Sequence, residues 1–199
     1  MDRVDVFRDG EKTYLRVIDY KTGSKRFDLQ KIATGRNLQM LIYLFALTKT
    51  DRPEFLRAVG ADPGRLFPAG VVYMETIPDE SKVAAHGADS APTPYKREGL
   101  FLHDDTVLLA MDDTKEHRFL PLRFNKDGRV NAADSRRLQT LSELGELLLT
   151  MQETIGQIMT SLRRGVANAY ADRTGGYSPC AHCDWKPLCR AAQRSASER

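Results

Sequence analysis

Apolar and polar side chains alternate with a period of two in the first part of the chain, which predicts β-strands. In residues 15–21 (LRVIDYK), odd-numbered side chains project to one face of a strand and even-numbered ones to the other. Asp19 and Lys21 therefore project side by side from a sheet that is otherwise mostly apolar. Burying two charges costs free energy unless they pair with each other or hold a metal ion. The segment predicts either a plain ion pair or an ionic site.

A second carboxylate belongs to the strand predicted just upstream. Residues 4–7 (VDVF) read as a strand and residues 8–11 as a tight turn with Asp-Gly at its centre. A two- or four-residue loop centred there would place Asp2 opposite Val17, and thus diagonally across from Asp19, about 7–8 Å away. A three-residue loop would turn Asp2 to the opposite face. Two carboxylates that share a divalent cation beside a lysine are suited to phosphodiester hydrolysis.

The next elements predict an α/β architecture. Residues 31–48 predict a buried helix that is apolar almost all round, with Arg36, Gln39 and Tyr43 as a polar stripe on one face. On spacing alone, Gln39 and Tyr43 either line a cleft or form hydrogen bonds inside the core. Residues 69–74 (AGVVYM) predict a buried strand of the same sheet.

The polar loop at residues 22–30 carries Lys25 and Arg26, which either contact phosphate or are solvated loop cations.

Composition changes at residues 76–94, which are rich in Ser, Ala, Pro and charge. We therefore predict two parts, a core at 1–94 and a C-terminal extension at 95–199. Within the extension, an apolar stripe predicts a helix over residues 131–164, capped by Asn131 and stopped by Gly165. That stripe packs across its own domain or forms a coiled-coil seam with a partner.

Overall composition is that of an ordinary soluble protein. Of 199 residues, 41% are hydrophobic and 29% charged, and the net charge is +3. This mildly basic balance is compatible with nucleic-acid binding without requiring it. No apolar run reaches membrane-spanning length and no signal-peptide pattern opens the chain, so we expect no membrane contact and a cytoplasmic location.

Three cysteines fall within ten residues, as Cys180-x2-Cys183-x5-Cys189. An odd number of cysteines in a cytoplasmic setting does not indicate a disulfide framework, and the spacing favours metal ligands over free thiols. Either His182 completes a zinc site, or the thiolates hold an iron–sulfur cluster whose fourth ligand lies outside this chain.

In order and spacing, Asp2, Asp19-Tyr20-Lys21, Gln39 and Tyr43 resemble the motifs of the RecB-like branch of PD-(D/E)XK nucleases. The resemblance implies a restriction-endonuclease-like mixed sheet flanked by helices. That fold normally opens with a further helix and strand, so we expect an N-terminally truncated fragment that binds metal poorly or is inactive in isolation.

Residues 99–102 (GLFL), residues 118–124 (RFLPLRF) and the three cysteines extend the resemblance over nearly the whole chain. They are similar to the C-terminal nuclease domain of AddB-type subunits of bacterial ATP-dependent helicase–nucleases. The resemblance implies Mg²⁺ or Mn²⁺ bound by Asp2, Asp19 and the backbone carbonyl of Tyr20. Lys21 would position the attacking water, and Gln39 and Tyr43 would support the centre or the DNA.

The same resemblance implies DNA contacts from Lys25, Arg26 and Arg36, and a [4Fe-4S] cluster on Cys180, Cys183 and Cys189. It also implies an AddA-type helicase partner in a heterodimer, and an exonuclease that trims the strand ending 5′ in double-strand-break repair and recombination. Two alternatives stay open. One is a Cas4-like or Dna2-like nuclease. The other is a non-catalytic zinc-knuckle module for DNA binding or subunit docking.

Overall fold

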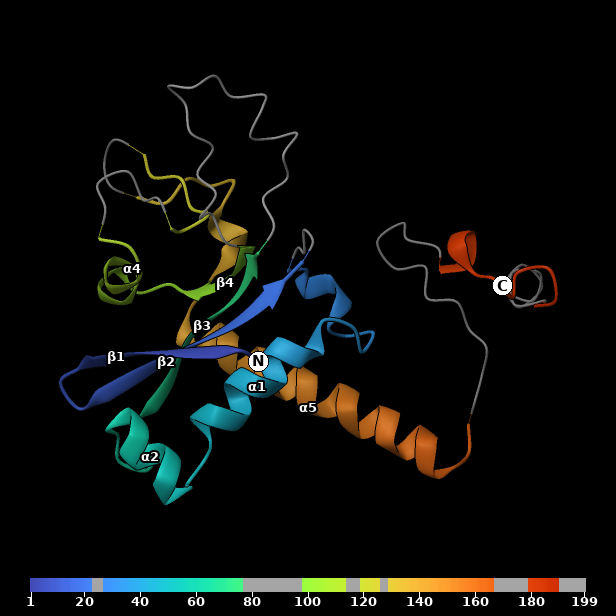
Figure 1. Ribbon diagram of the computed structural model, residues 1–199, viewed down its shortest axis with the longest axis horizontal. Helices are drawn as coiled ribbons and strands as arrows, with labels where there is room; N and C mark the ends of the chain where they lie inside the picture. Colours follow the sequence, from blue (N-terminus) through green and yellow to red (C-terminus); the bar gives the residue numbers. More distant parts are fainter. Residues whose placement is uncertain (23–26, 77–97, 114–118, 126–128, 167–178, 190–199) are drawn as a thin grey trace. The chain divides into compact units, whose positions relative to one another are not determined.

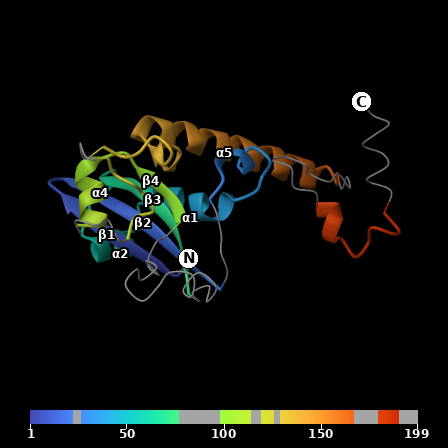
Figure 2. The same ribbon diagram turned by 90° about the horizontal axis from the view of Figure 1, so that it is seen from above.

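The computed structural model describes residues 1–22, 27–76, 98–113, 119–125, 129–166 and 179–189. Its centre is a five-stranded mixed sheet in the order β1-β2-β3-β4-β5. The strands are β1 (Arg3–Asp9), β2 (Lys12–Lys21), β3 (Leu66–Glu75), β4 (Glu98–Leu102) and β5 (Leu138–Gln139). The pairs β1–β2 and β3–β4 are antiparallel, whereas β2–β3 and β4–β5 are parallel. Figure 2 shows β1 to β4 lying next to one another in this order. The predicted α/β fold class is confirmed.

The hairpin between β1 and β2 differs in register from the prediction. Its two-residue loop is Gly10-Glu11, closed by the pair Asp9 and Lys12. Gly10 has a φ of 56°, which suits the first central position of a type II′ turn, where glycine is favoured. The register therefore differs by two residues from the prediction, with Arg3 opposite Ile18. Asp2 precedes the first paired residue, and its amide donates to the Ile18 carbonyl, so Asp2 does not lie opposite the predicted Val17.

Helices cover both faces of the sheet (Figure 1). The parallel connection from β2 to β3 contains α1 (Leu38–Thr48) and α2 (Pro53–Val59). Leu56 and Val59 of α2 pack with Leu15 of β2, with Leu47 of α1 against the same cluster. On the other face, α4 (Asp105–Met111) packs Leu108 against Ile18 and Val72, among others. The two faces together bury β2 along most of its length.

The predicted helix over residues 31–48 begins later than expected. A short 3-10 turn, η1 (Leu29–Lys31), comes first, and α1 starts only at Leu38. Gly35 and Asn37 have φ values of 78° and 59°, a left-handed conformation that interrupts an α-helix. Arg36 lies between them and so is not on the helix.

The sheet continues beyond the predicted boundary at residue 94, which itself lies outside the described residues. β4 pairs with β3, and Gly99 makes that pairing possible. A Cβ atom at Gly99 would lie 2.0 Å from the Val71 carbonyl oxygen. A division at residue 94 would therefore separate β4 from the strand with which it pairs.

The long C-terminal helix is shorter than the predicted 131–164. Residues 135–137 form a 3-10 turn, η2 (Ser135–Arg137), and α5 spans Leu141–Arg163. Its start is a capping box, in which the Thr140 hydroxyl accepts from the Glu143 amide and the Glu143 carboxylate accepts from the Thr140 amide. The predicted cap at Asn131 is wrong, because its side chain accepts from Ala133 inside a turn. The predicted stop at Gly165, with φ of 67°, is confirmed.

The chain separates into two compact units, residues 1–27 with 39–148 and residues 28–38 with 149–199. The first holds the whole sheet. In the second, Gly35 lies against Ile158 of α5, and η4 (Pro179–His182) carries Cys180. None of the helices in the described ranges is long and apolar enough to cross a membrane.

Candidate active site

Asp19 lies near the end of β2 and is 4% exposed. Its carboxylate has two cationic neighbours. Oδ2 is in contact with the Lys21 ammonium, and Oδ1 lies 3.5 Å from the terminal ammonium of Met1. Asp19 raises the pKa of Lys21. Oδ2 is buried, and the Lys21 ammonium is its partner in the described part of the chain. The predicted juxtaposition of Asp19 and Lys21 is present.

Asp2 approaches the same end of the sheet from the edge strand. Its amide donates to the Ile18 carbonyl (3.1 Å), which extends the β1–β2 pairing beyond Arg3. Its carboxylate accepts from the Tyr20 amide at 2.7 Å. Asp2 also adds to the electrostatic stabilisation of the Lys21 ammonium. The Asp2 and Asp19 carboxylates thus both act on the Lys21 ammonium, Asp19 by direct contact and Asp2 through its charge.

Gln39 and Tyr43 lie one turn apart on α1. The Gln39 carboxamide donates to the Tyr43 hydroxyl at 3.2 Å. This bond and the Met1 ammonium lower the pKa of Tyr43, while the charge of Asp19 opposes them. The effect of the Asp19 charge on this pKa means that the Tyr43 hydroxyl lies near the Asp19 carboxylate. The structure therefore brings this predicted pair to the acidic end of the sheet.

Arg36 does not join that pair. It precedes α1, and its Nε donates to the Thr34 hydroxyl at 3.5 Å. The predicted stripe of Arg36, Gln39 and Tyr43 on one helix face is wrong, because the left-handed residues on either side of Arg36 break the helical repeat. Lys25 and Arg26 lie outside the described residues.

Tyr73 is a neighbour of the site that the sequence did not reveal. It is paired with Asp19 in the parallel β2–β3 register. The Lys21 ammonium lies 5.8 Å from the centre of its ring, a cation–π distance. Burial raises the pKa of Tyr73, so its phenol is neutral beside Asp19. Tyr73 appears in the sequence as one of several apolar positions of a buried strand, and only the pairing register reveals its role.

The donor groups fit a hard divalent cation. Mg²⁺ is commonly bound by one or two carboxylates together with water, and Asp2 and Asp19 supply two carboxylates beside the backbone of Tyr20.

The cysteine segment does not form a comparable site. Cys180 is half-buried, Cys183 and Cys189 are exposed, and all three are free thiols. Across the described ranges, no three His, Cys, Asp or Glu side chains are grouped so that they hold a metal ion. His182, the alternative zinc ligand, is exposed. As arranged here, the cysteines do not fit a [4Fe-4S] cluster or a zinc ion.

Comparison with known proteins agrees with the sheet and its acidic end. Residues 1–190 match the PD-(D/E)XK nuclease superfamily. An Asp on one strand and Asp-x-Lys on the next, beside a mixed sheet, are the features that the resemblance predicted. The chain belongs to the PD-(D/E)XK nuclease superfamily.

Within that class, the chain is similar to AddB-type proteins, which are named as a subunit of an ATP-dependent helicase/deoxyribonuclease. The protein from Desulforudis audaxviator is 30% identical over 197 residues, covering 95% of this chain and 16% of that protein. The one from Clostridium kluyveri is 28% identical over 203 residues, covering 96% and 16%. The one from Carboxydothermus hydrogenoformans is 28% identical over 209 residues, covering 100% and 18%. The predicted resemblance is confirmed, and the chain spans about a sixth of these relatives.

Proposed function

We propose that this chain is a metal-dependent nuclease domain that hydrolyses phosphodiester bonds of DNA. The observation that carries the proposal is the buried Asp19 carboxylate with the Lys21 ammonium against it, and the Asp2 carboxylate bound to the adjacent Tyr20 amide. A buried carboxylate and its cation at the end of a strand cost stability in an apolar sheet. Their convergence suits a metal and a phosphate better than it suits a structural role.

Each residue has a specific task in this reaction. Asp2, Asp19 and the Tyr20 carbonyl would hold Mg²⁺ or Mn²⁺, which when bound would supply a water of lowered pKa and offset the charge of the phosphate. Lys21, held by Asp19, orients the attacking water and stabilises charge that develops on the phosphate oxygens. The Gln39–Tyr43 pair steadies the substrate or the Asp19 strand, and the Tyr73 ring packs beside the Lys21 ammonium.

The wider role rests on the relatives. Their names describe helicase/deoxyribonuclease subunits, and we extend this to an exonuclease domain of such a subunit, paired with an AddA-type helicase in the cytoplasm. The expected process is trimming of the strand ending 5′ during double-strand-break repair and recombination. The [4Fe-4S] cluster remains a prediction from cysteine spacing, and no part of the mechanism depends on it.

The test is Asp19→Asn, which removes one charge and keeps the side-chain shape. We expect hydrolysis of end-labelled DNA in Mg²⁺ to fall by a factor of about 100 or more, the loss typical of removing one preorganised electrostatic group. Asp9→Asn is the matched control, because Asp9 is an exposed acid on the same hairpin, and it should leave the rate unchanged. Thermal melting establishes that both variants fold.

Activity of Asp19→Asn close to that of the parent would refute the proposal. It would favour the competing interpretation, in which Asp19 and Lys21 are only an ion pair in a non-catalytic DNA-binding or docking module.

A further inference from the structure

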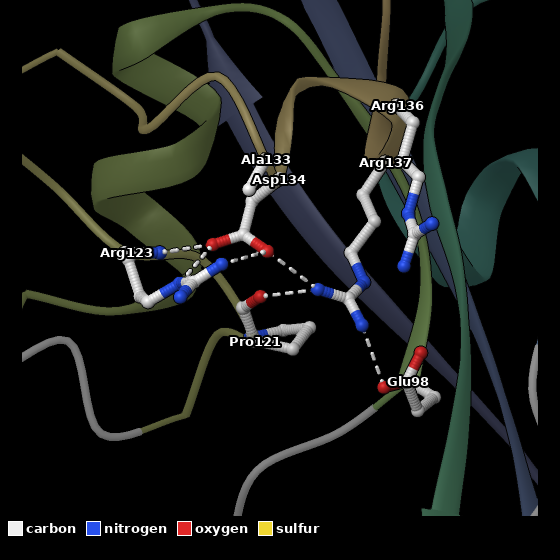
Figure 3. Close-up of a pocket in the computed structure, with 7 residues that line it drawn as sticks. All are labelled: Glu98, Pro121, Arg123, Ala133, Asp134, Arg136 and Arg137. Atoms are coloured by element: carbon white, nitrogen blue, oxygen red, sulfur yellow. Dashed lines mark hydrogen bonds and ion pairs between the residues drawn. The ribbon is translucent and has the colours of Figure 1, made fainter.

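A second polar site lies toward the other edge of the sheet, beside β4. Figure 3 shows a pocket of about 480 Å³ whose lining includes Arg123, Arg136, Arg137, Asp134 and Glu98. It lies entirely within the unit that contains the sheet. Its volume is in the range of small-ligand pockets. Three guanidinium groups face two carboxylates, which leaves one positive charge.

Asp134 organises this pocket. Its side chain is 5% exposed and accepts from the Arg123 amide at 3.1 Å, from Arg123 Nε at 2.8 Å and from Arg137 Nη1 at 2.9 Å. The same Nη1 donates to the Pro121 carbonyl, and Arg137 Nη2 donates to Glu98 at 2.7 Å. Asp134 thereby fixes two guanidinium groups, as the dashed lines in Figure 3 show. Hydrogen bonding to Arg123 lowers the pKa of Asp134, so the carboxylate stays charged.

Arg136 is different from its two neighbours. It is exposed, and it makes no hydrogen bond or ion pair within the ranges that the structure describes. Arg123 is also 64% exposed at its side chain, although Asp134 accepts from its Nε and, at 3.5 Å, from its Nη2, which leaves Nη1. Both guanidinium groups therefore have N–H donors available to a ligand. Planar N–H pairs of this kind match the oxygens of a phosphate.

The strand register relates this pocket to Asp19. Asp19 pairs with Tyr73, and Tyr73 pairs with Glu98 on β4. Paired residues of neighbouring strands project to the same face, so Asp19, Tyr73 and Glu98 form one row across the sheet. Two strand spacings of about 4.8 Å separate the backbones of Asp19 and Glu98 by about 10 Å. At a rise of 3.4 Å per nucleotide, the Glu98 backbone, at one side of the pocket, is about three nucleotides from Asp19.

We propose that the pocket formed by Arg123, Arg136 and Arg137 binds a backbone phosphate of the DNA strand whose cleaved bond lies at Asp19. The inference rests on the proposed nuclease function and extends it, because it names a second contact on the same strand. Arg136 and Arg123 contact the phosphate oxygens, while Asp134 and Glu98 hold the arginine side chains in place. The contact is independent of base sequence, since it is made to phosphate alone.

The experiment measures binding without cleavage. A fluorescein-labelled oligo(dT) strand is titrated with the purified protein in EDTA, and anisotropy gives the affinity at several salt concentrations. For Arg136→Ala we expect affinity to fall about two- to fivefold, as for one exposed ion pair. The slope of log K against log salt should decrease by about 0.7, the value for one phosphate on a single strand. Arg52→Ala, which removes an exposed arginine before α2, is the control and should change neither quantity.

Two results would overturn the inference. One is an Arg136→Ala variant that binds the strand with the affinity and salt slope of Arg52→Ala. The other is an Arg136→Ala variant that binds the strand normally but no longer binds free tripolyphosphate in a competition assay. The pocket would then be a site for a free phosphate compound and not for DNA. If the parent protein cleaves no DNA but Arg136→Ala still loses strand binding, the phosphate-binding role of the pocket is supported and the nuclease function is rejected. The two proposals therefore fail separately.

Discussion

The edge strand β1 directly follows Asp2, and the ion pair between Asp5 and Arg16 helps to hold this strand against β2. These residues face each other across the pair. Arg16 donates to Asp5 Oδ2 from Nη2 at 2.5 Å and from Nε at 3.1 Å. The Arg16 side chain is 11% exposed and the Asp5 side chain is 21% exposed. Asp5→Ala would leave the Arg16 guanidinium buried without its carboxylate.

The size of the effect follows from this burial. Removing one partner of a buried ion pair costs about 3–5 kcal/mol, and because Arg16 keeps some exposure we expect a value near the lower end, about 3 kcal/mol. For a chain of this size, each kcal/mol lowers Tm by about 2–4 °C, so Asp5→Ala should melt about 6–12 °C lower. The ion pair of Asp5 with Arg3 adds little to this free-energy cost, because Arg3 is largely exposed and the pair is screened by solvent.

The pH dependence supplies an independent check. Burial raises the pKa of Asp5, but the hydrogen bonds from Arg3 and Arg16 outweigh it, and the pKa is lower than the usual 3.8. The ionised carboxylate therefore stabilises the fold above pH 3.8, and this stabilisation disappears as pH falls through the lowered pKa. The difference in unfolding free energy between the parent and Asp5→Ala should be constant near neutral pH and should shrink in acid.

Urea denaturation measures both quantities, with Asp9→Ala as the control for an exposed acid of the same strand. The double variant Asp5→Leu with Arg16→Leu should recover much of the lost stability, because two apolar residues replace a desolvated pair. A loss for Asp5→Ala no larger than that for Asp9→Ala, or a double variant as unstable as the single one, would refute the role assigned to this ion pair. Nuclease activity should fall with Asp5→Ala as well, through misplacement of Asp2.

Two further predictions concern the sheet and its last helix. Gly99→Ala should destabilise the protein strongly, because the added Cβ would lie 2.0 Å from the Val71 carbonyl oxygen. In Gly145→Ala, on α5, the added Cβ meets no atom within 4 Å, and the variant should be more stable than the parent by about 0.5–1 kcal/mol. Comparable melting temperatures for the two variants would contradict the assigned β3–β4 pairing. Thr140→Ala removes the hydroxyl that accepts from the Glu143 amide and should cost about 1 kcal/mol in urea denaturation, with Thr140→Ser nearly neutral. Equal stability of Thr140→Ala and the parent would show that the capping box does not start α5.

The strand alternation was sufficient to place Asp19 and Lys21 together. A period of two decides which side chains share a face, and that holds whatever the strand pairs with. Register is a different matter, because turns at Asp9-Gly10 and at Gly10-Glu11 are both compatible with the sequence. A type I′ turn at Asp9-Gly10 needs a positive φ at both residues, and only Gly10 has one, which fits a type II′ turn at Gly10-Glu11. The register then puts Arg3 opposite Ile18, and Asp2 precedes the first paired residue.

The remaining differences come from tertiary structure. The apolar repeat predicted helix through residues 31–37, but two left-handed residues break it there. The repeat also predicted helix from residue 131, yet Asp134 turns inward to bind Arg123 and Arg137. The role of Tyr73 has no local signal, because it depends on the pairing of strands that are far apart in sequence. The arginine pocket has none either, because its residues at 121–137 are brought together by turns around Asp134 and not by a periodic pattern.

Three residues at one level of the sheet connect these findings. Asp19, Tyr73 and Glu98 stand at paired positions on three successive strands, and the Asp2 carboxylate lies beside them at the Tyr20 amide. Both carboxylates of this row have a cation beside them. Lys21 lies at Asp19, and Arg137 lies at Glu98. Buried pairs of this kind add little to stability compared with apolar side chains of the same size. A row of such pairs along one level of the sheet is therefore better explained by an extended anionic ligand than by folding, and a DNA strand lying along it would meet the metal site and the arginine pocket in turn.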